Sequence, residues 1–229
     1  MVEVDRLVQA AEPAQGFLVN AHAMLQVNDD ARLRAVVARC RLVNADGQAI
    51  VWATRLLGKP LPERVAGPDL FDALLELAAC KGYSVYLLGA RPGVAAEAAR
   101  REVASHPGLR IVGVHHGYFD KGRSVEIAEM IRRARPHMLF VGMESPWREY
   151  WISDNLDRLG VPFVLGVGGV LDVAAGLINR APFWMQRGGL EWAYRLYQEP
   201  ARMWKRYLIG NARFSALVIK ELLRSRSAV

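Results

Sequence analysis

Cysteine is scarce in this sequence, which has 229 residues and contains only Cys40 and Cys80. The two lie far apart and in no spacing typical of metal ligands. A disulfide-rich secreted scaffold is therefore excluded, and a reducing compartment is favoured. We predict that both cysteines are buried thiols.

The sequence also lacks a long apolar run. The longest stretch without Asp, Glu, Lys or Arg covers the 16 residues 13–28, and it contains Gln, Asn and His. Such a stretch is too short and too polar to span a bilayer. The N-terminus carries acidic residues and no apolar core, unlike a signal peptide. We therefore expect a cytoplasmic protein.

Several common catalytic motifs are missing. There is no GxGxxG, Walker loop, GxSxG or DxD, which disfavours dinucleotide-dependent dehydrogenases and serine hydrolases. His115 and His116 have no partner at a metal-ligand spacing, so we predict no metal site and no cofactor. Two glycine turns, 89–93 and 166–169, remain. Each is either a structural turn between strand and helix or a turn whose backbone amides receive phosphate.

The hydrophobic content of 52% and charged content of 23% are those of a globular protein able to build a large core. Short β-rich runs alternate with helical stretches, which predicts a Rossmann-like α/β fold with a mostly parallel sheet and helices on both faces. The predicted strands are 16–19, 41–45, 83–89, 109–119, 137–143 and 161–169. The predicted helices are 29–40, 48–57, 68–82, 90–106, 124–136, 145–160, 190–199 and 200–224, with Pro146 at the first position of its helix.

Ligands of parallel sheets bind beyond the carboxyl ends of the strands. Asp46, which interrupts an apolar run in RLVNADGQAIVW, falls at such an end. So do Gly89, residues 115–118, residues 142–144 and Gly168–Gly169. We expect all of them along one edge of the sheet. Taken alone, Asp46-Gly47 is either a turn or a catalytic group, and Arg64 in a proline-rich loop is equally open.

Positive charge is confined to the C-terminal end. Residues 180–229 hold ten Lys or Arg against three Asp or Glu, whereas the preceding 179 residues hold twenty of each. We expect this basic end to bind an anionic partner, which could be lipid headgroups, nucleic acid or substrate phosphates. On the predicted helix 200–224, one basic stripe is expected among aromatic and aliphatic residues, which suits a membrane interface or a solvated face. The stripe consists of Arg202, Arg206, Arg213, Lys220 and Arg224.

Taken together, several motifs resemble the WecG/TagA/CpsF family of bacterial glycosyltransferases, from about Phe17 to Leu208. The motifs are NADG (44–47), GKPLPERVAGPDLF (58–71), YSVYLLGARPGV (83–94), HHGYF (115–119), GVGGVLDVAAG (166–176), RAPFWM (180–185) and GLEWAYRLYQEPAR (189–202). The resemblance implies inverting, metal-independent transfer of a sugar from a UDP-sugar to a polyprenyl-diphosphate-linked saccharide. It also implies a peripheral enzyme of the inner membrane face, bound to anionic lipid and serving cell-surface polysaccharide synthesis.

The resemblance also assigns roles to residues. Asp46 matches the family's proposed base, while Asn20 and Arg64 match residues linked to substrate binding. A catalytic domain of residues 1–187 and a membrane-docking appendage of residues 188–229 are implied. The nucleotide contacts carry over to Tyr118 and Asp172, and the diphosphate contacts to Arg195, Arg202, Lys205 and the adjacent Arg206. From the two glycine turns we add Gly89, Gly168 and Gly169 as candidate substrate-binding residues.

Two positions depart from the family pattern. Leu18 stands where many members have Thr, and Pro-Trp-Arg148-Glu replaces Pro-Lys-Gln-Glu. Since both lie near the expected sugar site, the donor sugar stays open among N-acetylmannosamine, its uronic acid and glucose; Arg148 suits an acidic group. The oligomeric state is also open. The alternatives are a non-catalytic nucleotide-binding module tethered to a membrane and, ranked last, a nucleic-acid-binding protein, for which no recognised motif is present.

Overall fold

The computed structural model describes residues 1–227, and their side chains except those of Arg202 and residues 225–227. The chain forms two compact units that are interleaved in sequence. Unit 1 consists of Met1–Phe17, Ala35–Val43 and Gly67–Ile178; unit 2 consists of Leu18–Arg34, Asn44–Ala66 and Asn179–Val229. The predicted functional division at residue 187 stays a prediction, but the C-terminal end shares a compact unit with two N-terminal segments.

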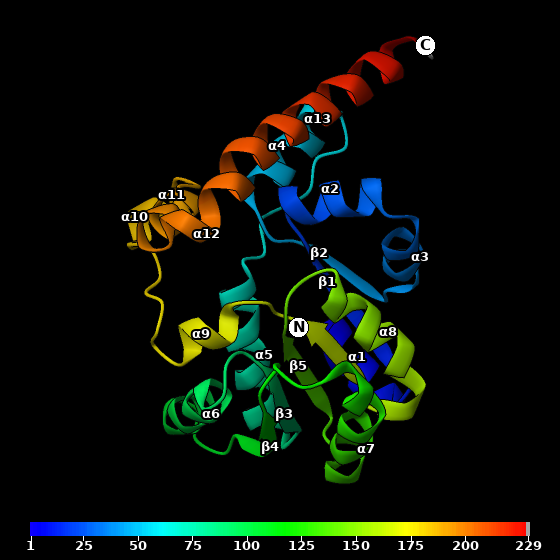
Figure 1. The fold of residues 1–229 in the computed structure, drawn as a ribbon, viewed down its shortest axis with the longest axis vertical. Helices are drawn as coiled ribbons and strands as arrows, with labels where there is room; N and C mark the ends of the chain where they lie inside the picture. The colour runs from blue at the N-terminus through cyan, green and yellow to red at the C-terminus, as the bar shows by residue number, and fades with distance from the viewer. Residues whose placement is uncertain (228–229) are drawn as a thin grey trace. The chain divides into compact units, whose positions relative to one another are not determined.

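Strands and helices alternate through most of the chain (Figure 1). The strands are β1 Ala14–Val19, β2 Leu42–Ala45, β3 Ser84–Gly89, β4 Arg110–His115, β5 Met138–Gly142 and β6 Phe163–Gly166. The helices are α1 Val2–Ala10, α2 Ala21–Asp29, α3 Ala31–Arg39, α4 Gln48–Leu56, α5 Gly67–Lys81, α6 Val94–Ser105, the 3₁₀ turn η1 Lys121–Arg123, α7 Ser124–Ala134, α8 Trp147–Leu159, α9 Val170–Ala174, α10 Phe183–Arg187, α11 Glu191–Gln198, α12 Pro200–Trp204, the π-helix η2 Lys205–Ile209 and α13 Gly210–Ser227.

The six strands form one sheet in the order β2-β1-β6-β5-β3-β4. The pairs β1–β6, β6–β5, β5–β3 and β3–β4 are all parallel. In a parallel sheet every connection crosses over through other structure, and the carboxyl ends of the strands share one edge. The predicted α/β class with a parallel sheet is confirmed.

Helices cover both faces of the sheet in unit 1. One face packs on α7 and α8, because Leu139 and Val141 of β5 share a core cluster with Ile131 and Trp151 of these helices. The intervening Phe140 points to the other face, where its ring lies 4.9 Å from that of Phe71 in α5. The alternation along β5 follows from the period of two in a strand. Interior strands β3 and β6 are buried along their whole length, as the apolar sequence predicts.

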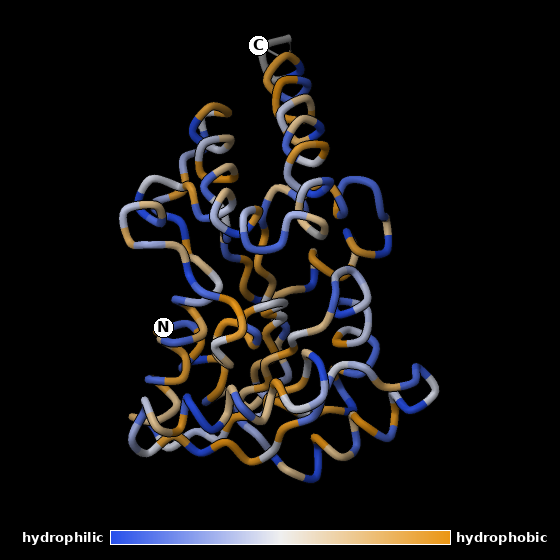
Figure 2. The backbone as a smooth tube through the Cα atoms, turned by 60° about the vertical axis from the view of Figure 1, so that its left-hand side comes forward, coloured by the Kyte–Doolittle hydropathy of each residue, from blue (hydrophilic) through white to orange (hydrophobic). Residues whose placement is uncertain are grey.

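Unit 2 has a smaller core built from segments distant in sequence. Leu25 of α2, Ala45 of β2 and Ile50 of α4 cluster with Phe214 of α13. The C-terminal helix also carries an ion pair to α2, with Arg213 Nη2 2.8 Å from Asp29 Oδ2. Helix α13 is therefore an integral part of unit 2 and not a free tail. In Figure 2, hydrophobic and hydrophilic residues alternate along this helix up to the label C.

The predicted helix 29–40 corresponds to α3, which begins two residues later than predicted. Asp30 is extended, with φ −120° and ψ 108°, and separates α2 from α3. Its carboxylate accepts hydrogen bonds from the backbone N–H groups of Arg32 (2.9 Å) and Leu33 (3.1 Å), as an N-cap does. The same kind of cap begins α2, which the sequence reading missed. Helices α1, α9 and α10 were also missed, and α8 begins at Trp147, so Pro146 is its N-cap and not its first residue.

The predicted helix 200–224 is helical along its whole length but is not a uniform α-helix, because the π-helix η2 lies between α12 and α13. A π turn is wider than an α turn and shifts the angular position of all later side chains. The basic residues therefore do not form one solvated stripe: Lys220 and Arg224 are exposed, Arg213 pairs with Asp29, and Arg206 is half-buried.

The prediction of two buried cysteines is wrong for Cys80, which is exposed near the end of α5. Cys40 is partly buried after α3. Burial, together with the nearby charge of Glu149, raises the pKa of its thiol to about 12. Among the described residues, no helix is both long enough and apolar enough to cross a membrane.

Candidate functional site

The loops after four strands of unit 1 are tied into one edge by backbone hydrogen bonds. The N–H of Ala90, after β3, donates to the carbonyl of Gly142 at the end of β5 (2.9 Å). The N–H of Gly117, after β4, donates to the carbonyl of Ala90, also at 2.9 Å, and Val167, after β6, donates to Val141. Within unit 1 the prediction that these strand ends share one edge is confirmed.

Glycine allows this close packing. Gly89 has φ +145°, and a Cβ added there would lie 2.5 Å from the backbone of Gly142. Gly142 in turn faces Leu171 and the carbonyl of Gly168, which has φ +57°. Ala90 also adopts a positive φ, 54°, an uncommon conformation that clusters at functional sites. The backbone conformation and the close packing at position 89 therefore require glycine. Phosphate binding by the turn that begins at Gly89 stays a prediction.

The predicted nucleotide contacts Tyr118 and Asp172 flank this edge. Tyr118 follows Gly117 and is 72% exposed, so its ring is free to stack on a planar ligand. Its N–H donates to Nδ1 of His116, at 3.2 Å. Asp172 lies half-buried in α9, directly after the turn that ends with Gly169. The predicted roles of these residues are not tested by their positions.

Arg148 is buried, unlike an ordinary surface arginine. Its Nε donates to Oε1 of the neighbouring Glu149 (2.8 Å) and its Nη1 to the carbonyl of Met143 (3.2 Å). A Cβ added at Gly166 would lie 2.4 Å from Arg148 Nε, so this glycine makes room for the guanidinium at the end of β6. A buried arginine needs such partners, and Glu149 already balances its charge. The predicted contact with an acidic donor sugar remains a prediction.

In unit 2, Asp46 and Asn20 lie side by side. The N–H of Asp46 donates to the carbonyl of Val19 at 2.8 Å, which joins the residue after β2 to the end of β1. Asn20 caps α2 by accepting a hydrogen bond from the N–H of Ala23 (3.0 Å). A Cβ on Gly47 would lie 3.4 Å from that of Asn20. The Asp-Gly pair therefore links β2 to α4, with Gly47 as the N-cap of the helix and Asp46 half-buried.

Arg64 is held next to the same strand end. The N–H of Val65 donates to the carbonyl of Ala45 (2.9 Å), so the PERVAG segment runs beside the end of β2. The guanidinium of Arg64 pairs with Glu191, the first residue of α11, with Nη1 3.2 Å from Oε2. The side chain of Arg64 is only 17% exposed. This burial sets Arg64 apart from a solvated surface arginine, and its predicted role in substrate binding stays a prediction.

Several charged residues of unit 2 lie near Tyr207. Its phenol is largely buried, and burial is the main reason that its pKa is raised. The positive charges of Arg206 and Arg195 act on it in the opposite sense, while Asp46 and Glu191 add to the rise. The aspartate, a predicted base, thus shares one neighbourhood with two of the predicted diphosphate-binding arginines. The ring of Tyr207 also packs against Trp192, with centroids 5.8 Å apart.

The remaining predicted diphosphate contacts are distributed along α11, α12 and η2. Arg195 is half-buried in α11, with Nε 3.8 Å from Oε2 of Glu199. Lys205 is exposed, with Nζ 5.5 Å from the centre of the Trp204 ring. Arg202 lies in α12, and its side chain is outside the described part of the structure.

Three residues of this neighbourhood were missed from the sequence. Glu191, Arg180 and Tyr207 all lie in or beside motifs that carry the family resemblance, but none was given a role. The signal for Arg180 was its charge within an otherwise apolar motif, whereas Glu191 lies in a motif with several other charged residues. Nothing local indicated that Tyr207, in an aromatic and basic stretch, would be largely buried.

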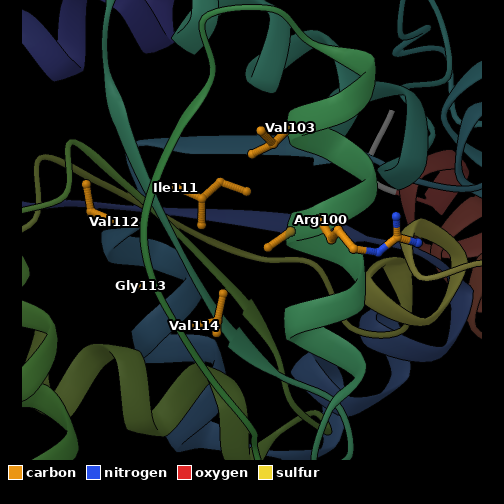
Figure 3. Close-up of a pocket in the computed structure, with 7 residues that line it drawn as sticks. Arg100, Val103, Ile111, Val112, Gly113 and Val114 are labelled. Carbon is orange, nitrogen blue, oxygen red and sulfur yellow. The ribbon is translucent and has the colours of Figure 1, made fainter.

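Two further features do not include the predicted site residues. An open apolar groove of about 420 Å³ lies between α6 and the edge strand β4, lined by Ala99, Arg100, Val103, Ile111, Val112, Gly113 and Val114 (Figure 3). Asp72, Glu102 and His106 of α5 and α6 form the one group within the described residues that brings three metal-ligand types together. It contains neither His115 nor His116, whose rings stack 4.5 Å apart.

The chain is similar in sequence to known proteins. A model of the glycosyl transferase WecG/TagA/CpsF family matches residues 1–228. The chain is 36% identical over 194 residues to an N-acetylglucosaminyldiphosphoundecaprenol N-acetyl-beta-D-mannosaminyltransferase of Bacillus spizizenii, covering 84% of this chain and 74% of the relative. It is 34% identical over 186 residues to the enzyme of the same name from Bacillus subtilis, covering 81% and 71%. The chain therefore belongs to the WecG/TagA/CpsF family of glycosyl transferases.

Proposed function

We propose that this glycosyltransferase transfers a sugar from a UDP-sugar to a saccharide linked to a polyprenyl diphosphate, with inversion and without a metal, at the inner membrane face. The observation that carries the proposal is the neighbourhood of Asp46 in unit 2. There a carboxylate fixed at a strand end shares its surroundings with Arg195 and Arg206. Both relatives are named for transfer to an undecaprenyl-diphosphate-linked sugar.

Asp46 acts in this proposal as the general base. Its carboxylate takes the proton of the acceptor hydroxyl, whose oxygen then attacks the anomeric carbon of the donor. The bond from that carbon to the diphosphate breaks, and UDP leaves with the electron pair from the side opposite the attack. The hydrogen bond from the Asp46 N–H to the carbonyl of Val19 holds the backbone that carries this base at the end of β1.

The departing diphosphate needs stabilisation of its growing negative charge. Arginines and lysines supply it, because guanidinium groups bind phosphate oxygens with paired hydrogen bonds. Arg64, Arg195, Arg206, Lys205 and the predicted Arg202 are the residues assigned to this task. Unit 2 is suited to it by composition, with fifteen Lys or Arg against seven Asp or Glu.

We assign recognition of the nucleotide to the strand ends of unit 1. Exposed Tyr118 offers a face for the uracil ring, and the backbone N–H groups of the turn after Gly89 suit phosphate. Asp172 is the residue assigned to the ribose. The donor sugar is left open, because Leu18 and Arg148 depart from the family pattern where the sugar is expected.

We further propose that unit 2 attaches the enzyme to anionic lipid. Large apolar side chains are exposed on its C-terminal segment, among them Phe183 (71%), Trp184 (66%), Tyr197 (83%) and Leu208 (62%). Aromatic rings and basic residues together favour the membrane interface, where each Lys or Arg contributes about 1 kcal/mol. An enzyme attached in this way meets a lipid-linked acceptor without spanning the bilayer.

The test is transfer by the purified chain from a panel of UDP-sugars to a short-chain prenyl-diphosphate saccharide, with product mass as the readout. We expect a product heavier by one sugar residue with one donor of the panel, no effect of EDTA, and no product from Asp46→Asn. Turnover by Asp46→Asn at the normal rate would remove the assigned base. Absence of product with every donor would refute the transfer reaction.

Membrane attachment needs point variants and not a truncation, because Phe214 of α13 belongs to the core of unit 2. We expect Phe183→Ser/Trp184→Ser to lower binding to vesicles with anionic lipid by about tenfold or more, since about 2–3 kcal/mol of apolar burial is lost. Val125→Ser, an exposed apolar position of unit 1, is the control. Equal binding by all three proteins would contradict docking through this segment.

A further inference from the structure

Glu191 is placed between two arginines that come from different segments of unit 2. Its Oε2 lies 3.2 Å from Arg64 Nη1, and its Oε1 lies 3.6 Å from Arg180 Nη2. Each carboxylate oxygen therefore faces a separate guanidinium. Two oxygens bridging two guanidinium groups is also the arrangement in which a phosphate group is bound by an arginine pair.

The segments that carry the two arginines are held by contacts that do not involve Glu191. The backbone next to Arg64 is held by Val65, whose N–H donates to the carbonyl of Ala45. Arg180 Nη2 donates to Oε1 of Gln186 (2.9 Å), and Gln186 Nε2 donates in turn to the carbonyl of Ala181 (2.7 Å). Removal of the carboxylate charge should therefore leave the two guanidinium groups in place, as a preformed anion site.

The site is accessible to an anion. The side chains of Arg64, Arg180 and Glu191 are 17%, 28% and 26% exposed, so an incoming anion can reach them. Glu191 faces two guanidinium groups with a single negative charge. A diphosphate carries more negative charge than one carboxylate and therefore attracts the arginine pair more strongly.

We propose that Glu191 is an internal substitute for a phosphate group, and that a substrate diphosphate displaces it to bind Arg64 and Arg180. Arg180 then becomes a substrate-binding residue, and Glu191 is the carboxylate that occupies the arginine pair until the diphosphate arrives. The inference deepens the proposed function and rests on it for the identity of the ligand.

The test is binding of inorganic pyrophosphate to the full chain, measured by calorimetry. Glu191→Gln keeps the size of the side chain and removes its charge, so pyrophosphate no longer competes with an anion. We expect Glu191→Gln to bind pyrophosphate about tenfold more tightly than the wild type. The control is Glu221→Gln, which removes the same charge from an exposed pair with Arg224 in the same unit and should change nothing.

A second variant keeps the inference testable if Glu191→Gln does not fold. Arg180→Gln should bind pyrophosphate about tenfold less tightly, whereas Arg187→Gln, the exposed arginine of α10, should bind like the wild type. In the Arg180→Gln background the gain from Glu191→Gln should shrink. The inference is overturned if Glu191→Gln binds pyrophosphate no more tightly than Glu221→Gln does. It is also overturned if Arg180→Gln binds pyrophosphate no less tightly than Arg187→Gln does. Glu191 would then have only a structural role.

Two further ligands show whether the arginine pair binds the diphosphate of the donor or that of the acceptor. A gain for UDP alone assigns the arginine pair to the leaving group, and a gain for geranyl diphosphate alone assigns it to the acceptor; a gain for neither overturns the inference. These measurements need no sugar transfer. A protein that shows the gain but transfers no sugar would refute the proposed reaction and leave the phosphate site standing.

Discussion

Unit 1 and unit 2 differ in what they offer to a ligand. Unit 1 carries fifteen Lys or Arg and sixteen Asp or Glu, and its strand ends are formed by glycines and backbone hydrogen bonds. Unit 2 carries a net charge of +8, and its candidate site is formed by half-buried charged side chains. The first arrangement suits a ligand that approaches the backbone closely, and the second suits one that carries charge.

The difference extends to how each unit is stabilised. Unit 1 buries large side chains completely on both faces of its sheet, such as Phe140, Phe163 and Trp151. Unit 2 has a small cluster around Phe214, and its segments are also joined by ion pairs whose partners are partly exposed. Because partly exposed pairs contribute little to stability, we expect the cluster around Phe214 to stabilise unit 2 more than these ion pairs do.

The largest expected effect separates binding from chemistry. If unit 1 binds the nucleotide and unit 2 carries the base, Asp46→Asn should lower the transfer rate by about 10³-fold, within the range for loss of a general base. The Kd for UDP, measured by calorimetry, should change by less than threefold. A variant that loses UDP binding in proportion to its rate would show instead that Asp46 positions the donor.

The strand ends of unit 1 give the next largest effect. Gly89→Ala should lower the free energy of unfolding by about 3 kcal/mol or more, because the new Cβ meets the backbone of Gly142 and the φ of +145° is strained for alanine. Gly93→Ala is a matched control: its φ is +85°, but nothing lies within 4 Å of the new Cβ. It should cost about 1–2 kcal/mol.

Denaturant unfolding checks both glycine variants. Equal losses in Gly89→Ala and Gly93→Ala would mean that backbone conformation alone matters at Gly89. The close approach of the β3 and β5 ends would then not constrain unit 1.

Most of unit 1 could be predicted from the sequence because its signals are local. Apolar runs such as 83–89 read directly as interior strands, and the glycines that follow them read as turns at the carboxyl edge. The chemistry of Arg148 could not be predicted in this way. Its partner Glu149 is adjacent in sequence, but its burial depends on the empty space that Gly166 leaves at the end of another strand.

The core of unit 2 should respond to loss of Phe214. Phe214→Ala should destabilise unit 2 by about 3 kcal/mol, at the low end for buried phenylalanine, because the cluster is small and Phe214 is still 7% exposed. Phe140→Ala, in the fully buried core of unit 1, should cost about 4–5 kcal/mol. Ile219→Ala, 55% exposed on the same helix as Phe214, is the control and should cost less than about 1 kcal/mol.

Thermal unfolding followed by tryptophan fluorescence can detect these losses. A Phe214→Ala protein as stable as Ile219→Ala would show that α13 contributes nothing to the core of unit 2. The C-terminal end would then behave as an appendage in the sense that the sequence suggested.

The site in unit 2 could be predicted only in part. Asp46 and Arg64 were found through motifs, and the strand-end position supported the first. The pairing of Arg64 with Glu191 joins segments from opposite ends of the chain, and no periodicity or spacing reports such a contact. The regular spacing of Arg202, Arg206, Arg213, Lys220 and Arg224 predicted one basic stripe, but it did not reveal the π-helix η2, which contains Arg206 and precedes Arg213.

A smaller effect tests whether unit 2 recognises its ligand by geometry or only by charge. Arg64→Lys keeps the positive charge but loses the planar fork that pairs with carboxylate or phosphate oxygens. We expect kcat/KM for transfer to fall about tenfold, equivalent to about 1.4 kcal/mol. Arg55→Lys, an exposed arginine in the last turn of α4, is the control. Equal activity of the two variants would mean that only net charge matters at Arg64.

We expect the smallest effect on fold and activity from chemical modification of the thiols. This experiment compares the reactivity of Cys40 and Cys80, which both lie in unit 1. Thiolate is the reactive form of cysteine, and the pKa of about 12 keeps the Cys40 thiol protonated at pH 8. Cys80 is exposed and should react with one equivalent of a thiol reagent in the native protein, whereas both cysteines should react in denaturant. Peptide mass mapping identifies the labelled residue. Burial is the main cause of the raised pKa of Cys40. Rapid labelling of Cys40 in the native protein would therefore mean that unit 1 opens around α3 and β2. Unit 1 would then resemble unit 2, whose stabilising contacts are partly exposed.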